Sequence, residues 1–239
     1  NTALGDGVDV LMGGGGHHFT PYDKARNPKG RADGRDMMAE FAARGYTVAL
    51  DRAGMLAAPA GRKFIGIYSA DDHLDYELAR RPGQPSLAEM TRKAIDLLKD
   101  DPAGFFLMVE GGKIDDALHA TNARNALADT VAMDDAVKVA VDRMREIDPG
   151  LANTLVVVTA DHDHTMTFNG YAKRGNSVLD IVRSYHDGQP ARDADGKTYT
   201  TLVFGNGPNR KDLREDVASE EALGDDYHQE TGLKAKSES

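Results

Sequence analysis

The sequence contains no cysteine among its 239 residues. Disulfides and thiolate metal sites are therefore excluded, and any bound metal must be held by His, Asp or Glu side chains. The chain also lacks an apolar run of about 18 residues, which a bilayer-spanning helix needs, and a basic stretch followed by an apolar segment, which would indicate a signal peptide. Because the chain begins at Asn1 rather than at Met, we expect the second absence to say little about export.

Positively charged residues are also outnumbered by negatively charged ones. The formal net charge is −10, with 29 Lys and Arg residues against 39 Asp and Glu residues. A protein of this charge does not work by neutralising nucleic-acid phosphates or by docking on an anionic membrane. We therefore expect small molecules, metals or other proteins as partners, and no nucleic acid. The 40% hydrophobic content lies in the globular range and predicts one folded domain or part of one.

Apolar runs alternate with helical patterns along the chain, which predicts an α/β fold with a mostly parallel central sheet flanked by helices. We expect helices at residues 36–45, from residue 86 to residue 98, and in one long stretch after residue 112 that ends near residue 147. The expected strands are residues 9–12, 46–50, 63–68, 105–109, 154–159 and 201–204. The fourth and fifth are apolar runs of the kind found in central strands buried on both faces.

Three other stretches are predicted to be less regular. The glycine run at residues 13–16 invites comparison with a phosphate-binding loop, but no Lys-Ser or Lys-Thr follows it, so a plain loop at a strand end is favoured. Residues 187–197 are polar and turn-rich, which predicts a surface excursion. Residues 214–239 show no packed pattern.

Asp115 and His119 lie four residues apart at the start of the long predicted helix. This spacing puts a carboxylate and an imidazole on one helix face, within reach of a single ion, as in zinc sites of the H-E-x-x-H type. A pair of this kind is more often a solvated helix face, so the metal interpretation needs support. Glu110, five residues earlier at the end of a predicted strand, strengthens it.

A second cluster, Asp161 to His164, follows the predicted strand at residues 154–159. Ligands collect at the carboxyl ends of strands in open α/β sheets. Crowded carboxylates and imidazoles are costly there unless a cation or hydrogen bonds compensate them, and a hydrophilic loop is the alternative on these residues alone. Two such clusters favour a metal centre with oxygen and nitrogen ligands, which suits zinc, with magnesium where oxygens dominate.

Both clusters resemble stretches of one known family. Residues 109–115, VEGGKID, together with His119 and the stretch NARNAL at 122–127, resemble the first metal-binding stretch of alkaline phosphatases. Residues 157–164, VVTADHDH, resemble that family's second metal-binding stretch, at a similar distance along the chain. Weaker stretches read like the bacterial and animal enzymes in the same order, at residues 9–15, 85–90, 104–109, 170–177 and 202–208. The resemblance therefore covers most of the chain.

The resemblance implies a fold and a set of metal ligands. The fold would be the family's three-layer sandwich, incomplete here, with residues 1–239 forming one partial domain truncated at both ends. Two zinc ions and one magnesium ion are implied as cofactors. Glu110 would bind the magnesium, Asp115 and His119 the first zinc, and Asp161 and His162 the second zinc.

Two further residues have implied roles around these ligands. His164 would be hydrogen-bonded to one of the ligands, as metal-binding carboxylates commonly require. Asp116 stands at a position that is often His or Lys in the family, where it would tune phosphate binding through water. A carboxylate there would repel a phosphate dianion unless the metals screen it.

No catalytic residue is expected in this chain. In the family, the nucleophilic Ser of an Asp-Ser-Ala stretch, the Asp shared by the second zinc and magnesium, and the phosphate-binding Arg all lie upstream of the region that resembles this sequence. No Asp-Ser-Ala occurs here. The remaining ligand of the first zinc lies in a His-x-Gly-Glu stretch that would follow Ser239, so His228 is not expected to take its place. The chain alone is expected to turn over poorly or not at all.

The implied function is hydrolysis of phosphate monoesters at alkaline pH, through a phosphoserine intermediate, in the complete enzyme. The family also implies a homodimer and a periplasmic or secreted location. The alternatives are a sulfatase, phosphodiesterase or metal-dependent mutase of the same superfamily, a catalytically silent metal-binding module, and an α/β protein whose acidic loops are merely solvated. The Glu110-Gly-Gly stretch favours the phosphomonoesterase.

Overall fold

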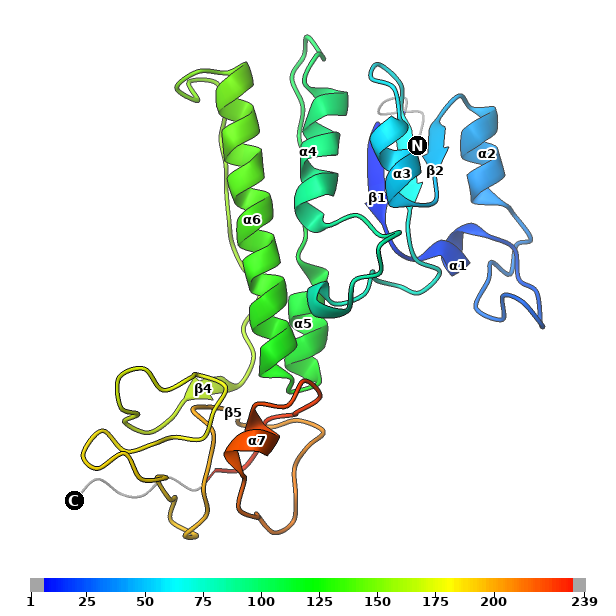
Figure 1. Cartoon of the computed structure of the whole chain (residues 1–239). Coiled ribbons are helices and arrows are strands. Elements are labelled where there is room, and N and C mark those ends of the chain that lie inside the picture. The colour runs from blue at the N-terminus through cyan, green and yellow to red at the C-terminus, as the bar shows by residue number, and fades with distance from the viewer. Residues whose placement is uncertain (1–6, 234–239) are drawn as a thin grey trace. The chain divides into compact units, whose positions relative to one another are not determined.

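A computed structural model describes residues 7–233 (Figure 1). The chain divides into two compact units. The first, here called the sheet unit, comprises residues 7–113 and 129–157 of the described chain, and the second, the loop unit, comprises residues 114–128 and 158–233. Within residues 7–233, no helix combines the length and the apolar character that crossing a bilayer requires.

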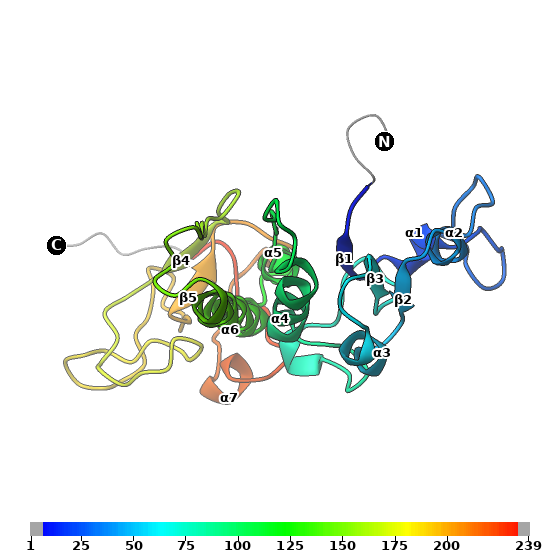
Figure 2. The ribbon, with the colours of Figure 1, turned by 90° about the horizontal axis from the view of Figure 1, so that it is seen from above.

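The sheet unit contains a parallel sheet of three strands, β1 (Val10–Gly13), β2 (Thr47–Ala49) and β3 (Phe64–Ile67), in the order β1-β3-β2. Figure 2 shows β3 between its two neighbours. All four residues of β3 are buried, as expected of a central strand. The strands expected at residues 9–12, 46–50 and 63–68 are confirmed, with each end shifted by one residue. The predicted α/β class with a parallel sheet and helices is confirmed as well.

Short helices surround this sheet, and their first residues explain where they begin. Asp36, Asp51 and Ser86 each accept a hydrogen bond from a backbone amide three residues ahead, which caps a helix start. Ser86 and Glu89 form a reciprocal capping box. The elements are α1 (Gly16–Phe19), α2 (Met37–Ala43), α3 (Arg52–Ala57), the 3-10 turn η1 (Glu77–Ala79) and α4 (Leu87–Leu98).

The long helix expected up to residue 147 is two helices, α5 (Gly112–His119) and α6 (Ala123–Ile147), so the prediction of one continuous helix is wrong. The break occurs at Thr121, which has a left-handed φ of 59° that no helical residue adopts. Asn122 restarts the helix by accepting the amide of Asn125 at 2.9 Å. Gln229 supports the junction, since its side chain accepts the Ala123 amide at 2.8 Å.

Two apolar runs that we expected to be buried strands are not in any sheet of the described chain. Residues 105–109 and 154–159 are largely exposed, with Phe106 at 90% and Leu155 at 86% of full exposure. Strand formation requires a neighbouring strand to pair with the backbone amides and carbonyls. No segment of residues 7–233 pairs with either run in a ladder, so the predicted strands are wrong despite their composition.

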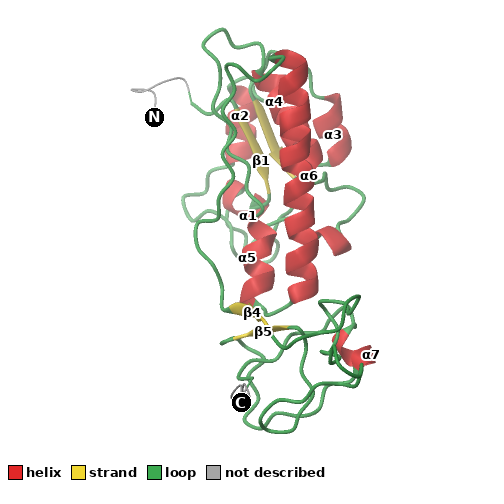
Figure 3. Ribbon diagram, turned by 90° about the vertical axis from the view of Figure 1, so that its left-hand side faces the viewer, coloured by secondary structure: helices red, strands yellow, loops and turns green. Residues whose placement is uncertain are grey.

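The loop unit has little regular structure, as the green colour of Figure 3 makes clear. Its strands β4 (Met166–Phe168) and β5 (Leu202–Phe204) pair antiparallel, and α7 is Ser219–Ala222. The predicted strand at residues 201–204 is thus confirmed. The prediction that residues 214–239 lack packing is wrong for the described part, because Val217 and Gln229 are buried. Residues 234–239 lie outside the described residues.

Candidate metal centre

Helix α5 carries the first pair of predicted ligands. Asp115 lies in its first turn and His119 in its last. The helical spacing brings His119 Nε2 to 3.4 Å from Asp115 Oδ2. Both side chains are open to solvent, with exposures of 45% for Asp115 and 69% for His119. A carboxylate near the helix start and an imidazole near its end also suit the helix dipole.

Two histidines from far along the chain join this pair. His164 Nε2 lies 2.7 Å from Asp115 Oδ1, and His162 Nε2 lies 3.8 Å from the same oxygen. The His164 ring meets the His119 ring edge-on, with centroids 4.7 Å apart. Both predicted clusters of the loop unit therefore converge on Asp115. We call Asp115, His119, His162 and His164 the α5 centre.

His164 is held against Asp115 by a hydrogen bond. Because an ionised carboxylate only accepts, the nitrogen Nε2 of His164 donates. This bond is the main reason why the pKa of Asp115 is lowered from its usual value. The contact is the kind expected for His164 beside a ligand, although the ligand roles themselves stay predictions.

His162 presents an unprotonated nitrogen to two carboxylates when it is neutral. Its Nδ1 lies 3.1 Å from the Asp163 carbonyl oxygen, which can only accept, so the proton sits on Nδ1. The other nitrogen, Nε2, then faces Asp115 at 3.8 Å and Asp161 Oδ2 at 3.5 Å. The bond to Asp163 and the charge of Asp161 raise the pKa of His162. A lone pair among carboxylates fits a bound cation.

The remaining predicted residues lie at different places. Asp161 is 89% exposed, and its Oδ2 lies 3.5 Å from His162 Nε2. Asp116 is half-buried on α5. Glu110 belongs to the sheet unit, where it lines an open cavity of about 400 Å³. The structure therefore brings together Asp115, His119, His162 and His164, with Asp161 at the edge of this group.

Gly112, two residues after Glu110, has a steric role. A Cβ added to Gly112 would lie 3.1 Å from the His73 ring and 3.5 Å from a carboxylate oxygen of Glu110. Gly112 therefore allows the start of α5 to approach the His73 ring, whereas the distance to Glu110 is an ordinary contact. The sequence motif signals this close approach, but it does not name His73 as the neighbour.

The match to known proteins decides the family. A family model for alkaline phosphatase matches residues 2–239. The chain belongs to the alkaline phosphatase family. This family is metal-dependent, and the α5 centre supplies a candidate metal-binding group. The resemblance inferred from the two His and Asp stretches is thereby confirmed.

Similar proteins include animal alkaline phosphatases. The tissue-nonspecific isozyme of Rattus norvegicus is 33% identical over 97% of this chain and 45% of its own length. The membrane-bound alkaline phosphatase of Bombyx mori is 36% identical over 93% of this chain and 41% of its own length. The chain thus spans somewhat less than half the length of these curated relatives.

Solved alkaline phosphatase structures share the fold. The enzyme from the Antarctic bacterium TAB5 superposes with a TM-score of 0.54 at 25% identity, covering 81% of this chain and 51% of that one. The Thermus thermophilus enzyme has a TM-score of 0.52 at 36% identity, covering 60% of this chain and 29% of that one.

A second group of possible ligands was missed by the sequence reasoning. His17, His18 and Asp72, all in the sheet unit, place one ligand atom each within 4.8 Å of one another. The sequence signals this group only through the His-His pair that follows the glycine run. Asp72 gave no signal of its own, because it lies 54 residues beyond His18 along the chain.

Proposed function

We propose that this chain supplies metal ligands to an enzyme that hydrolyses phosphate monoesters. The observation that carries the proposal is the convergence of His119, His162 and His164 on Asp115, from two stretches that both match alkaline phosphatases. The sulfatase and phosphodiesterase alternatives gain no support from the proteins that this chain resembles. Because the chain spans less than half of its relatives, the activity is proposed for the whole protein.

The proposed cofactors are two zinc ions and one magnesium ion. Asp115 and His119 would hold the first zinc, Asp161 and His162 the second, and Glu110 the magnesium. When bound, these ions supply positive charge that stabilises the charge developing on the phosphoryl group and on its leaving oxygen. Nitrogen and carboxylate donors suit zinc, whereas a lone carboxylate with water suits magnesium.

The residues of this chain act by holding these positions. His164 fixes the Asp115 carboxylate through its 2.7 Å hydrogen bond. The Asp163 carbonyl fixes the His162 ring so that Nε2 points toward the carboxylates. The nucleophile of the proposed mechanism is a serine outside this sequence, which would form a phosphoserine that water then cleaves.

Asp116 is proposed to weaken the binding of the phosphate product. Its carboxylate follows Asp115 directly on α5 and adds negative charge next to the centre. In an active complex containing this chain, Asp116→His should therefore tighten inhibition by inorganic phosphate. Unchanged phosphate inhibition would contradict this role. Asp116→Asn is the matched variant that removes charge without adding a base.

The activity can be tested by complementation. The chain alone is expected to bind Zn²⁺ and to release no p-nitrophenol from p-nitrophenyl phosphate. Mixing it with an amino-terminal portion of a family member that contains the Asp-Ser-Ala stretch should restore hydrolysis. Asp115→Ala should abolish the restored activity, whereas His186→Ala, on an exposed loop, should not.

The outcomes of that assay separate the candidate functions. Faster cleavage of bis-p-nitrophenyl phosphate or of p-nitrophenyl sulfate would favour the phosphodiesterase or the sulfatase. Zinc binding with no activity in any mixture would favour the catalytically silent module. Absence of zinc binding would contradict the ligand assignment as well.

We also propose a homodimer and a periplasmic or secreted location for the whole protein, on family membership alone. The relatives' names show that one of them, from Bombyx mori, is membrane-bound. Light scattering of the whole protein would test the dimer. Fractionation of the cells that produce it would test the location.

A further inference from the structure

The glycine run at residues 13–16 brings helix α1 against the chain that follows β3. A Cβ added to Gly14 would lie 2.8 Å from the carbonyl oxygens of Asp71 and Asp72, so only glycine fits there. The amides of Gly15 and Gly16 donate to the carbonyls of Asp71 and Ser69, at 2.5 and 2.9 Å. These amides already donate hydrogen bonds within the protein, so they are not free to bind a phosphate. The glycines instead allow two backbone segments to pack closely against each other, a contact that we call the docking of α1.

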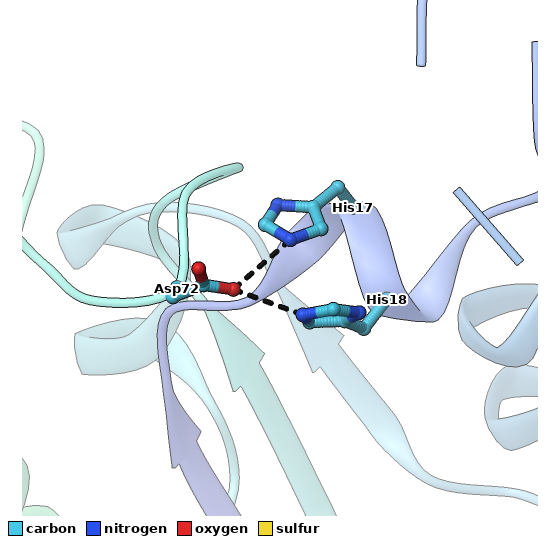
Figure 4. A group of neighbouring side chains, drawn as sticks. All are labelled: His17, His18 and Asp72. Atoms are coloured by element: carbon cyan, nitrogen blue, oxygen red, sulfur yellow. Dashed lines mark hydrogen bonds and ion pairs between the residues drawn. The ribbon is translucent and has the colours of Figure 1, made fainter. Parts of the chain in front are cut away.

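This docking places two imidazoles on one carboxylate oxygen. His17 and His18 extend from α1 toward Asp72, as Figure 4 shows. His17 Nε2 lies 3.0 Å and His18 Nε2 lies 2.9 Å from the same atom, Asp72 Oδ1. Adjacent helix residues normally point in different directions, so this convergence is unusual. We call these three residues the α1 triad.

The orientation of His17 points its nitrogen Nε2 at a carboxylate, where a cation would stabilise the contact. His17 Nδ1 contacts the carbonyl oxygen of Ala70, which can only accept a hydrogen bond, so the ring proton lies on Nδ1. In the neutral ring, Nε2 then presents a lone pair to the Asp72 carboxylate. Two acceptors at 3.0 Å repel each other unless a second proton or a metal ion compensates them. His17 is buried, with 7% exposure, so its ring cannot rotate into the solvent to relieve this repulsion.

The separations fit a metal ion. With metal–ligand distances near 2.1 Å, two ligands lie roughly 2.9 Å apart at a right angle and roughly 3.4 Å apart in a tetrahedron. The distances of 2.9 and 3.0 Å to Asp72 Oδ1 are hydrogen-bond lengths that lie close to the first value, so a tetrahedral ion would draw these side chains apart by about 0.4 to 0.5 Å. A carbonyl bonded to the far nitrogen of a ligand histidine is also typical of metal sites, since it fixes the tautomer.

We propose that the α1 triad binds a divalent transition metal ion of the zinc class and thereby ties α1 to the segment after β3. Two imidazoles and one carboxylate suit Zn²⁺ and not Mg²⁺ or Ca²⁺, which prefer oxygen ligands. His18 and Asp72 are open to solvent, at 64% and 58%, so water completes the coordination. None of the three residues belongs to the ligand set proposed for phosphatase activity.

Zinc counting on the full chain tests the proposal. The α5 centre is first removed by changing all four of its residues, Asp115, His119, His162 and His164, to Ala. Equilibrium dialysis against Zn²⁺ followed by metal analysis should then find one equivalent. His18→Ala or Asp72→Asn in that background should lower the affinity at least about 10-fold, because even indirect partners of metal ligands cost 10- to 100-fold. His18 is exposed, so its loss should leave the fold intact.

Controls distinguish zinc bound at the α1 triad from zinc bound at other exposed histidines. His186→Ala removes an exposed histidine that stacks on Tyr185 and should change nothing. Mg²⁺ at the same concentration should not displace the zinc. An equal affinity in the background chain and in its His18→Ala and Asp72→Asn variants would overturn the proposal, as would an equal loss in His186→Ala. Failure of the phosphatase proposal would leave this count unchanged, because the α5 centre is absent from it.

Thermal unfolding gives a second readout. An ion that binds only the folded state stabilises it in proportion to the logarithm of its concentration. Zn²⁺ should therefore raise the unfolding temperature of the background chain, and less so that of its Asp72→Asn variant. An identical rise in both would contradict the α1 triad as the binding site.

Discussion

The sheet unit buries apolar side chains under a parallel sheet, whereas the loop unit also buries charged ones among its turns. Phe64 and Ile65, on β3, are at most 1% exposed. In the loop unit the side chains of Arg214, Asp193 and Glu230 are each at most 5% exposed. The loops of this unit are thus held by paired polar groups, which substitute for the hydrogen-bond ladder of a sheet.

Breaking the buried charges should have the largest effect on the loop unit. Arg214 pairs with Asp193 and lies 2.7 Å from Glu230. We expect Arg214→Met to lower the free energy of unfolding by about 3–5 kcal/mol, because two buried carboxylates lose their nearest partner and only Glu230 keeps another cation, Lys211, at 4.0 Å. Urea unfolding measures the change. Lys138→Ala removes an exposed ion pair and, as the control, should cost at most about 0.5 kcal/mol.

Hydrogen exchange shows whether that loss is confined to one unit. Arg214→Met should reduce amide protection in β5 more than in β3. Equal loss in both strands would mean that the two units unfold together, and the contrast between them would then have no energetic meaning.

Truncation of the sheet core should have a similar but slightly smaller effect. Phe64→Ala removes a fully buried ring at the start of β3 and should cost about 3–4 kcal/mol, through lost burial and the remaining cavity. The matched control is Phe106→Ala, at a side chain that is 90% exposed, which should stay within about 0.5 kcal/mol of the parent. A large cost at Phe106 would show that residues 105–109 are covered in solution.

The sheet unit also contains a carboxyl group whose pKa is raised by burial. Burial raises the pKa of Asp129, on α6, to about 6, although the amide of Glu77 and the charge of Lys113 act the other way. A carboxyl with a raised pKa binds its proton more tightly in the folded state, so stability is present at low pH and is lost as pH rises from about 4 to about 6. Asp129→Asn should therefore be more stable than the parent at pH 7.5 by about 1–2 kcal/mol. Unfolding curves at pH 4 and pH 7.5 test this, and a constant difference would contradict it.

The smallest expected effect concerns a helix start. Ser86 accepts the Glu89 amide at 3.2 Å and begins α4. Ser86→Ala should cost about 1 kcal/mol, the usual value for losing an N-cap. Ser86→Asp keeps an acceptor and should restore most of the stability. If both variants unfold at the same urea concentration, the cap has no role in the sheet unit.

The candidate sites differ in how far the sequence revealed them. Asp115 and His119 follow helix spacing, and the His162 and His164 cluster was visible as a motif, so the members of the α5 centre were foreseen. Their meeting at one carboxylate was not, because it depends on how two distant segments fold together. The α1 triad was missed altogether, since nothing near Asp72 in the sequence points to His17.

The sequence by itself determined the family, the α/β class and the strands that find partners within this chain. Those features depend on local apolar patterns, capping residues and short motifs, which act over a few neighbouring residues. Tertiary structure alone decided that residues 105–109 and 154–159 pair with no strand within residues 7–233, that Thr121 divides the long helix, and that charges are buried near Arg214. Each of these depends on which distant segment supplies a hydrogen-bond partner, and a one-dimensional pattern carries no record of that.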